Sequence, residues 1–301
     1  MKTRNQQIHF PLLERKKVTL HVKRDDLIHP FVSGNKFRKL KYNLEEAQKT
    51  GVQTLLTFGG AYSNHIAATA AAAKENGLYS IGVVRGEELQ GRWHDNPTLQ
   101  FAVRQGMQLH FVTRQAYKTK TGPQFLAELE NRFGPFYHIP EGGSNTLAVK
   151  GCEEILTDSD AVFDVICCCT GTGTTFAGIV NSAKTTQRLI GFPALKGDFL
   201  REDIRKFADN GDWELQTDFH FGGYAKVDES LIHFINDFKR KTDIPLDPVY
   251  TGKMFYGIMR LIEDDFFPEN TKILAIHTGG LQGIAGMNAL LKKKGLPQID
   301  I

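Results

Sequence analysis

Short apolar runs alternate with helical patterns along almost the whole chain. The apolar runs cover residues 55–58, 81–84, 109–112, 162–169 and 273–276. The helical patterns between them end at Gly51, Gly77 and Gly106, and glycine favours the left-handed backbone that closes a helix. This alternation predicts an α/β fold with a mostly parallel sheet and helices on both faces. Ligands of such folds bind beyond the carboxyl ends of the strands, so the loops after the strands are the first candidates for a site.

Composition limits the classes of protein that the chain can belong to. The chain has 301 residues, 41% of them hydrophobic, which is enough for one large or two closely packed domains. Its 37 basic and 34 acidic residues nearly balance, and no basic block suggests nucleic acid. No apolar run is long enough to span a membrane, and no apolar segment follows the cations near Met1. We therefore expect a cytoplasmic protein without a nucleic-acid or membrane partner.

The four cysteines are Cys152 and the adjacent Cys167, Cys168 and Cys169. Three adjacent residues of a strand point alternately to opposite faces, and their spacing matches no zinc site. We interpret them as small apolar residues of a buried parallel strand and expect no metal site.

The segment Ser33-Gly34-Asn35-Lys36-Phe37-Arg38-Lys39-Leu40 places a lysine at the start of a predicted helix. We expect Ser33 or Asn35 to cap this helix. The positive end of the helix and the neighbouring cations both disfavour the ammonium of Lys36, whose ordinary pKa is about 10.4. This is the setting of a lysine that attacks a carbonyl as a neutral amine. The alternative is an ordinary surface lysine.

The loop after the strand at 55–58 reads Gly59-Gly60-Ala61-Tyr62-Ser63-Asn64-His65 and leads into an alanine-rich helix. Glycines allow close approach of a ligand, and the positive helix end can hold a carboxylate. The Ser63 hydroxyl can give or take a proton. The alternative interpretation is a simple helix cap, and for His65 we expect a supporting role at most.

A second loop, Thr170-Gly171-Thr172-Gly173-Thr174-Thr175, follows the cysteine strand and precedes a helix. Its backbone amides, hydroxyls and helix dipole predict a phosphate site. Glycines at 171, 173 and 178 do not give the dinucleotide pattern G-x-G-x-x-G, and the lysine of a P-loop is missing.

Three other polar segments receive structural interpretations. Arg24 is expected to form an ion pair with Asp25 or Asp26 at a charged corner. His94 and Asp95 lie in the polar segment 85–97, which suits a solvated loop better than an acid–base pair. Residues 195–217 are charged and helical in pattern, which predicts a solvated face.

Five separated segments resemble, in order, the pyridoxal-phosphate enzymes of the 1-aminocyclopropane-1-carboxylate (ACC) deaminase and D-cysteine desulfhydrase family. The strongest are the segment at Lys36, the loop 59–65 and Asp247-Pro248-Val249-Tyr250-Thr251-Gly252-Lys253. The resemblance extends from about residue 18 to 289. It implies a tryptophan-synthase-β-like (fold type II) enzyme and a homodimer. It also implies a large cofactor domain at 1–43 and 145–301, and a small substrate-closing domain at 44–144.

The resemblance also implies roles for individual residues. Lys36 would carry pyridoxal 5'-phosphate and take the α-proton, and Asn64 would face the pyridoxal ring oxygen. Ser63 and Tyr250 would face the substrate, and which of them assists the leaving group is open. Tyr224 would lie over the cofactor, although Ala225 stands where the family has glycine. The remaining cofactor residues are Thr251 and Thr278 at the pyridine nitrogen, and Gly171, Thr172, Gly173, Thr174 and Thr175 at the phosphate.

Residue 251 bears on the substrate. In the family, ACC deaminases typically carry glutamate at this position and D-cysteine desulfhydrases carry threonine. Thr251 therefore implies a lyase that converts a small amino acid, D-cysteine, to pyruvate, hydrogen sulfide and ammonia. Alternatives are ACC deamination to 2-oxobutyrate, elimination from another small amino acid such as a sulfonated one, a nucleotide-dependent oxidoreductase, and a non-catalytic pyridoxal-phosphate-binding protein.

Overall fold

Two sheets form the framework of the computed structural model, which describes residues 2–197, 199–208 and 211–300. The larger sheet has six strands in the order β1-β2-β10-β7-β8-β9, and the smaller has four in the order β5-β4-β3-β6. The strands are β1 (Asn5–Ile8), β2 (Thr19–Lys23), β3 (Thr54–Gly59), β4 (Tyr79–Arg85), β5 (Met107–Val112), β6 (Tyr137–Ile139), β7 (Val165–Thr170), β8 (Arg188–Pro193), β9 (Trp213–Leu215) and β10 (Lys272–Ile276).

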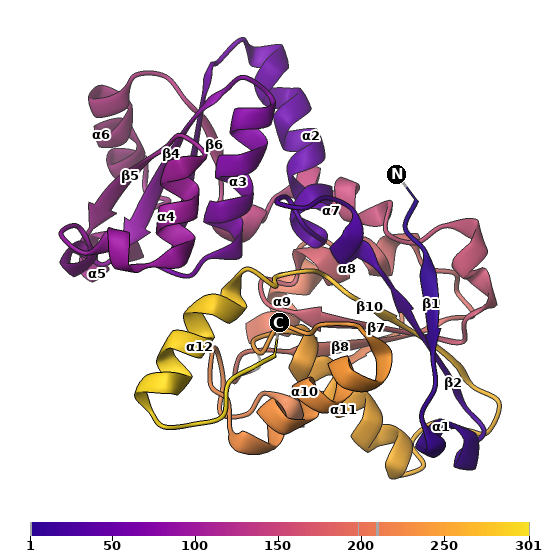
Figure 1. Cartoon of the computed structure of the whole chain (residues 1–301). Helices are drawn as coiled ribbons and strands as arrows, with labels where there is room; N and C mark the ends of the chain where they lie inside the picture. The colour runs from indigo at the N-terminus through magenta and orange to yellow at the C-terminus, as the bar shows by residue number, and fades with distance from the viewer. Residues whose placement is uncertain (1, 198, 209–210, 301) are drawn as a thin grey trace.

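Helices lie between the strands, as the alternating pattern predicts. Figure 1 shows the four-stranded sheet and its helices in purple, with the orange and yellow helices beside the larger sheet. The α-helices are α1 (Pro11–Arg15), α2 (Asn35–Thr50), α3 (Asn64–Glu75), α4 (Pro97–Arg104), α5 (Arg114–Lys118), α6 (Pro123–Phe133), α7 (Thr146–Glu153), α8 (Thr174–Ser182), α9 (Phe199–Arg205), α10 (Glu229–Thr242), α11 (Thr251–Glu263) and α12 (Gly283–Lys293). The short 3-10 helices are η1 (Asp25–Leu27), η2 (Glu87–Leu89), η3 (Trp93–Asp95), η4 (Glu141–Gly143), η5 (Asp158–Val162) and η6 (Thr217–Phe219).

Parallel pairing confirms the predicted fold class. Among the described residues, β1 and β2 form the only antiparallel pair, and all other neighbouring strands run parallel. None of the helices in the described ranges is both long and apolar enough to cross a membrane.

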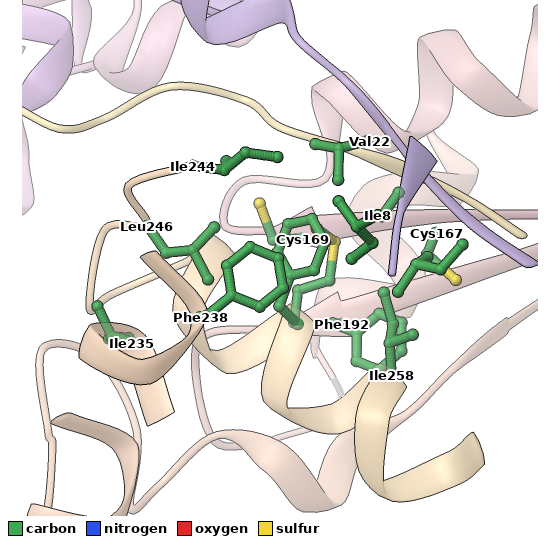
Figure 2. Packing of buried hydrophobic residues seen from close by; sticks show 14 of the residues in the cluster. Ile8, Val22, Cys167, Cys169, Phe192, Ile235, Phe238, Ile244, Leu246 and Ile258 are labelled. Atoms are coloured by element: carbon green, nitrogen blue, oxygen red, sulfur yellow. The ribbon is translucent and has the colours of Figure 1, made fainter. Parts of the chain in front are cut away.

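Strand β7 runs through the centre of the larger sheet, and its thiols alternate between two apolar clusters. Cys167 and Cys169 pack on one face with Ile8, Val22 and Phe238, as Figure 2 shows. Cys168 packs on the opposite face in a second cluster. All four cysteines are free and buried, which confirms that they serve as small apolar residues.

The two sheets draw on different parts of the chain. All strands of the smaller sheet lie within 54–139, and the larger sheet takes its strands from before residue 24 and after residue 164. Helix α2 joins them, because its Leu40 and Ala47 pack with Leu55 and Ile139 of the smaller sheet. The division into a large domain at 1–43 and 145–301 and a small one at 44–144 stays a proposal, and its first boundary falls inside α2.

The start of α2 is held by a buried corner of charges. Arg24 pairs with Asp26 at 2.7 Å, whereas Asp25 pairs with Arg38 of α2 at 3.1 Å. The expected Arg24 ion pair is therefore present, with Asp26 as its partner. All four side chains are almost completely buried, so each charge depends on its partner for the stability that water would otherwise give.

The expected caps of α2 were wrong. Gly34 is the N-cap, and no side chain caps the helix. The Ser33 hydroxyl instead donates to the Asp26 carbonyl, and the Asn35 amide nitrogen Nδ2 donates to Thr175. Gly34 has φ +60°, and a Cβ there would lie 1.9 Å from the Thr278 carbonyl oxygen. Close approach to Thr278 therefore requires glycine at this position.

The segment 195–217 also differs from its expectation of a solvated helical face. It contains the short helix α9 and the strand β9, which pairs with β8. Leu200 and Ile204 of α9 are buried in the core cluster that includes Cys168. Residues 198, 209 and 210 of this segment lie outside the described residues. By contrast, His94 and Asp95 are exposed, as a solvated loop requires.

We expect Arg38→Met to destabilise the protein by about 3–5 kcal/mol, because it leaves the Asp25 carboxylate buried without its partner. The matched control is Arg260→Met, which breaks an exposed ion pair with Glu263 and should cost at most about 1 kcal/mol. Urea unfolding measures both values. Equal losses in the two variants would contradict the structural role of the buried pair.

Candidate active site

Lys36 is the second residue of α2 and lies directly after the Gly34 turn. Its Nζ contacts the Asn35 Oδ1 at 3.3 Å. The side chain retains some exposure, but the protein atoms around the amine lower its pKa to about 7. Burial is the largest cause, and the charge of Lys39 is the second. A large fraction of Lys36 is therefore the neutral amine near neutral pH, as a nucleophile or proton acceptor requires.

Lys39 lies one helical turn further along α2 and is buried. Its Nζ donates to the Gly142 carbonyl at 3.1 Å and to the Thr172 Oγ1 at 3.3 Å. Burial lowers the pKa of Lys39 as well. Lys39 thus points from α2 toward the loop 170–175, and its charge acts on the neighbouring Lys36, so two lysines concentrate positive charge at the start of α2.

The loop 170–175 connects β7 to α8. Gly173 has φ +79° and is the N-cap, so the first backbone amides of α8 point out of the helix without carbonyl partners of their own. A Cβ on Gly171 would lie 2.9 Å from the Tyr250 ring. The hydroxyls of this loop lie among other polar groups: Thr172 with Lys39, Thr174 with Ser144, and Thr175 with Asn35. Amides and hydroxyls beside a buried lysine form a site for a phosphate group.

Ser63 and Asn64 begin α3, which follows β3. The Ser63 hydroxyl caps the helix by accepting from the Ile66 amide at 3.2 Å, so the cap interpretation of the sequence is correct. Asn64 Oδ1 is buried and has no hydrogen-bond partner within the described part of the chain. An unsatisfied buried amide oxygen is costly, and a polar ligand would relieve that cost.

His65 lies beside the site and contacts Thr57 of β3. Its Nε2 lies 2.8 Å from the Thr57 hydroxyl, and burial, with the charges of Lys36 and Lys39, keeps its pKa well below the usual value. The imidazole is therefore neutral and adds no charge beside the two lysines.

Asp247 organises the start of α11. Its carboxylate accepts from the backbone amides of Val249, Tyr250 and Thr251 at 2.8–2.9 Å. The Thr251 hydroxyl donates to the same carboxylate at 2.7 Å, and Thr251 is completely buried. The hydroxyl of residue 251 is therefore fixed in position by Asp247.

Tyr250 and Tyr224 form an aromatic pair with ring centroids 6.2 Å apart. Burial is the main cause that raises the pKa of Tyr250 well above its usual value, so its phenol keeps its proton. Tyr224 is 49% exposed and sits on a loop whose base is held by Lys253, which donates to the carbonyls of His220 and Gly223 at 2.8 Å. Ala225 has φ +54°, a conformation that suits the glycine of the family pattern.

Thr278 closes the arrangement from the end of β10. Its Oγ1 lies 3.1 Å from the Cys169 Sγ, and its carbonyl accepts from the Asn35 amide at 3.1 Å. A Cβ on Gly280 would lie 2.9 Å from Asn64 and 3.6 Å from the Asp247 carboxyl carbon. Direct contacts link several of the sequence-predicted residues: α2 contacts Thr172, Thr175 and Thr278 through Lys39 and Asn35, and Gly171 lies against Tyr250, whose ring neighbours Tyr224.

Three residues support this site without having been predicted from the sequence: Lys39, Asp247 and Lys253. Lys39 follows Lys36 by three positions and so shares a helix face with it, which is a signal that the sequence contains. Asp247 has the signal of an acidic residue shortly before an apolar helix. The role of Lys253 depends on a loop some 30 residues earlier in the chain, which no local pattern reveals.

These residues fit pyridoxal phosphate. A phosphate matches the amides of α8 beside Lys39, an aldehyde matches the neutral amine of Lys36, and the unpartnered Asn64 amide matches a polar ring atom. Gly171 leaves room where a side chain would meet Tyr250.

Comparison with known proteins identifies the family. Residues 6–279 match the family described as pyridoxal-phosphate dependent enzymes, and the chain belongs to that family. It is a pyridoxal-phosphate-dependent enzyme of the lyase and deaminase type.

Two relatives and one solved structure narrow the class. A Pyrococcus horikoshii protein is 32% identical over 283 residues, covering 88% of this chain and 85% of its own. It is named for ACC deaminase, an activity that its name marks as provisional. A mitochondrial Arabidopsis thaliana protein, named bifunctional D-cysteine desulfhydrase/ACC deaminase, is 30% identical over 88% of this chain and 73% of its own. The crystal structure of an ACC deaminase homologue has a TM-score of 0.80 and 28% identity over 97% of this chain and 94% of that one.

The lowered pKa of Lys36 predicts how its reactivity depends on pH. An amine is neutral above its pKa, so attachment of pyridoxal phosphate to cofactor-free protein should accelerate through pH 7 and level off near pH 8. Borohydride fixation followed by peptide mass spectrometry measures the labelling of Lys36, and Lys36→Ala should show none at this position. Nα-acetyl-lysine, the control, should still accelerate up to about pH 10. If labelling of Lys36 had the same pH profile as Nα-acetyl-lysine, the lowered pKa of Lys36 would be disproved.

Gly171→Ala should weaken cofactor binding by roughly tenfold, because the new methyl group forces the Tyr250 ring to shift at a cost of about 1–3 kcal/mol in overpacking. Gly91→Ala is the control, since a Cβ there meets nothing within 4 Å. Titration of the cofactor's absorbance measures both affinities. Unchanged binding in Gly171→Ala would place the cofactor away from this loop.

Proposed function

We propose that the enzyme converts D-cysteine and water to pyruvate, hydrogen sulfide and ammonia. The observation that carries this choice is the buried Thr251, whose hydroxyl is fixed by Asp247. In the family, D-cysteine desulfhydrases carry threonine at this position and ACC deaminases typically carry glutamate. The name of the Arabidopsis relative, which includes D-cysteine desulfhydrase, supports the same choice.

Pyridoxal phosphate would be held by residues from five segments of the chain. Lys36 would bind its aldehyde, and the loop 171–175 with Lys39 its phosphate. Asn64 would face the ring oxygen, and Thr251 and Thr278 the nitrogen side. When bound, pyridoxal phosphate withdraws electrons from the α-carbon of an attached amino acid, which acidifies the α-proton.

The protein's own residues then move the protons. Lys36, with its pKa near 7, accepts the α-proton, a contribution typically worth about 10²–10⁴-fold in rate. The amides at the start of α3 and the Ser63 hydroxyl hold the substrate carboxylate. Tyr250 keeps its proton because burial raises its pKa, so it is suited to protonate the departing sulfur, with Tyr224 beside it.

Deamination of ACC to 2-oxobutyrate is the second candidate function. The observation that favours it is the naming of relatives for ACC deaminase. A protonated pyridine nitrogen accelerates the opening of the cyclopropane ring more than it accelerates the release of sulfide. A hydroxyl at position 251 stabilises that protonated nitrogen less than a carboxylate would.

Incubation of the cofactor-loaded protein with D-cysteine, L-cysteine and ACC tests the substrate. We expect pyruvate and sulfide in equal amounts from D-cysteine, and no 2-oxobutyrate from ACC. The control is Lys36→Ala, which should lose nearly all turnover.

If ACC gave 2-oxobutyrate and D-cysteine gave nothing, the substrate assignment would be wrong, while the class of enzyme would stand. A protein that binds the cofactor and gives no product from any amino acid would instead support a non-catalytic binding protein.

A further inference from the structure

Arg85 is the last residue of β4 and lies beside the loop that leads to Ser63. In the sheet, its neighbour Val84 pairs with Gly59, the last residue of β3. The Arg85 Nη2 lies 3.7 Å from the point that a Cβ on Gly60 would occupy. Its guanidinium therefore lies against the glycines that precede α3, with no side chain between them.

The positive charge of Arg85 is not neutralised by the protein. Arg85 is exposed and has neither an ion pair nor a hydrogen bond to any described residue. The acidic side chains near it have other partners: Glu141 binds Lys120 at 3.2 Å, and Glu88 binds Arg114 at 2.6 Å. The guanidinium also lies over the face of the Tyr117 ring, 5.7 Å from its centroid. Its donors remain available to a ligand.

Arg85 also approaches the proposed substrate site, because the glycine loop that it lies against leads directly to Ser63 and Asn64. Burial raises the pKa of Tyr224 and a hydrogen bond with Tyr250 lowers it; the charges of Asp247 and Glu141 raise it further, and the charge of Arg85 lowers it. Arg85 is thus within electrostatic range of a phenol on the other side of the site. The start of α3 and Arg85 are then two positive elements that border one site.

We propose that Arg85 binds an acidic group on the substrate's side chain, while the start of α3 holds its α-carboxylate. This inference rests on the proposed function and names the substrate class: small amino acids whose β-substituent is an anion or leaves as one. A guanidinium binds carboxylates and sulfonates through paired hydrogen bonds. With D-cysteine, the carbon–sulfur bond breaks, the sulfur keeps the electron pair and leaves as HS⁻, and a proton then gives H₂S. ACC has no acidic β-substituent, so Arg85 gives it no advantage.

The test compares aspartate with asparagine, which have nearly the same shape and differ in the charge of the β-substituent. Both enantiomers of each are titrated into cofactor-loaded protein, and the cofactor's absorbance reports binding. We expect at least one enantiomer of aspartate to bind about tenfold more tightly than its asparagine counterpart. This ratio should fall to near one in Arg85→Gln and be partly retained in Arg85→Lys.

Arg104→Gln is the matched control. Arg104 ends α4 just before β5 begins, so it lies at the amino end of the smaller sheet, opposite Arg85. This variant removes the same charge and should keep the wild-type ratio. A ratio unchanged in Arg85→Gln overturns the inference, as does a wild-type protein that binds asparagine as well as aspartate or binds neither.

The same proteins separate this inference from the proposed reaction. If the aspartate preference depends on Arg85 but D-cysteine gives no sulfide, the reaction is wrong and Arg85 keeps its assignment. If D-cysteine gives sulfide and the preference is absent, the reaction stands and the role of Arg85 is disproved.

Discussion

The structure depends on holding a lysine amine in partly dehydrated surroundings at the point where α2 begins. Water would stabilise the ammonium, so the fold must fix Lys36 where little water reaches it. Gly34 permits this by letting the backbone approach the Thr278 carbonyl, and Arg38 permits it by tying α2 to the buried Asp25. Lys39 adds a second positive charge one turn away, which lowers the pKa of Lys36 further. The reactivity of Lys36 thus depends on three neighbouring residues: Gly34, Arg38 and Lys39.

Electrostatic balance explains how the site can contain so many charges. The polar groups near the two lysines do not cancel their charge. The Asp247 carboxylate already accepts hydrogen bonds from the start of α11, and His65 is neutral. Few of the described acidic groups are therefore free to pair with the two lysines. The positive charge of the lysines can act on an anionic ligand instead. This suits a phosphorylated cofactor and a substrate that carries a carboxylate.

Much of the fold and site could be predicted because their signals are local. Strand and helix periods gave the parallel α/β architecture, and the segments around Lys36, Ser63 and Tyr250 each lie in one loop after a strand or before a helix. The failures involve contacts that the local sequence pattern does not reveal. Ser33 is a good cap by composition, but the Asp26 carbonyl takes its hydroxyl, and Lys253 acts on a loop that it meets only in the folded chain. Leu200 and Ile204 show that charged neighbours do not prevent a short helix from burying one face.

Helix α2 belongs to both halves of the molecule, since it begins among the loops of the larger sheet and packs along the smaller one. We regard α2 as the axis about which the smaller sheet could rotate. Lys36 lies close to this axis and Arg85 lies at the far end of β4, so any rotation of the smaller sheet about α2 would carry Arg85 through a wider arc than Lys36. Lys36, the proposed nucleophile, would stay in place while Arg85, the proposed contact of the substrate's side chain, moved.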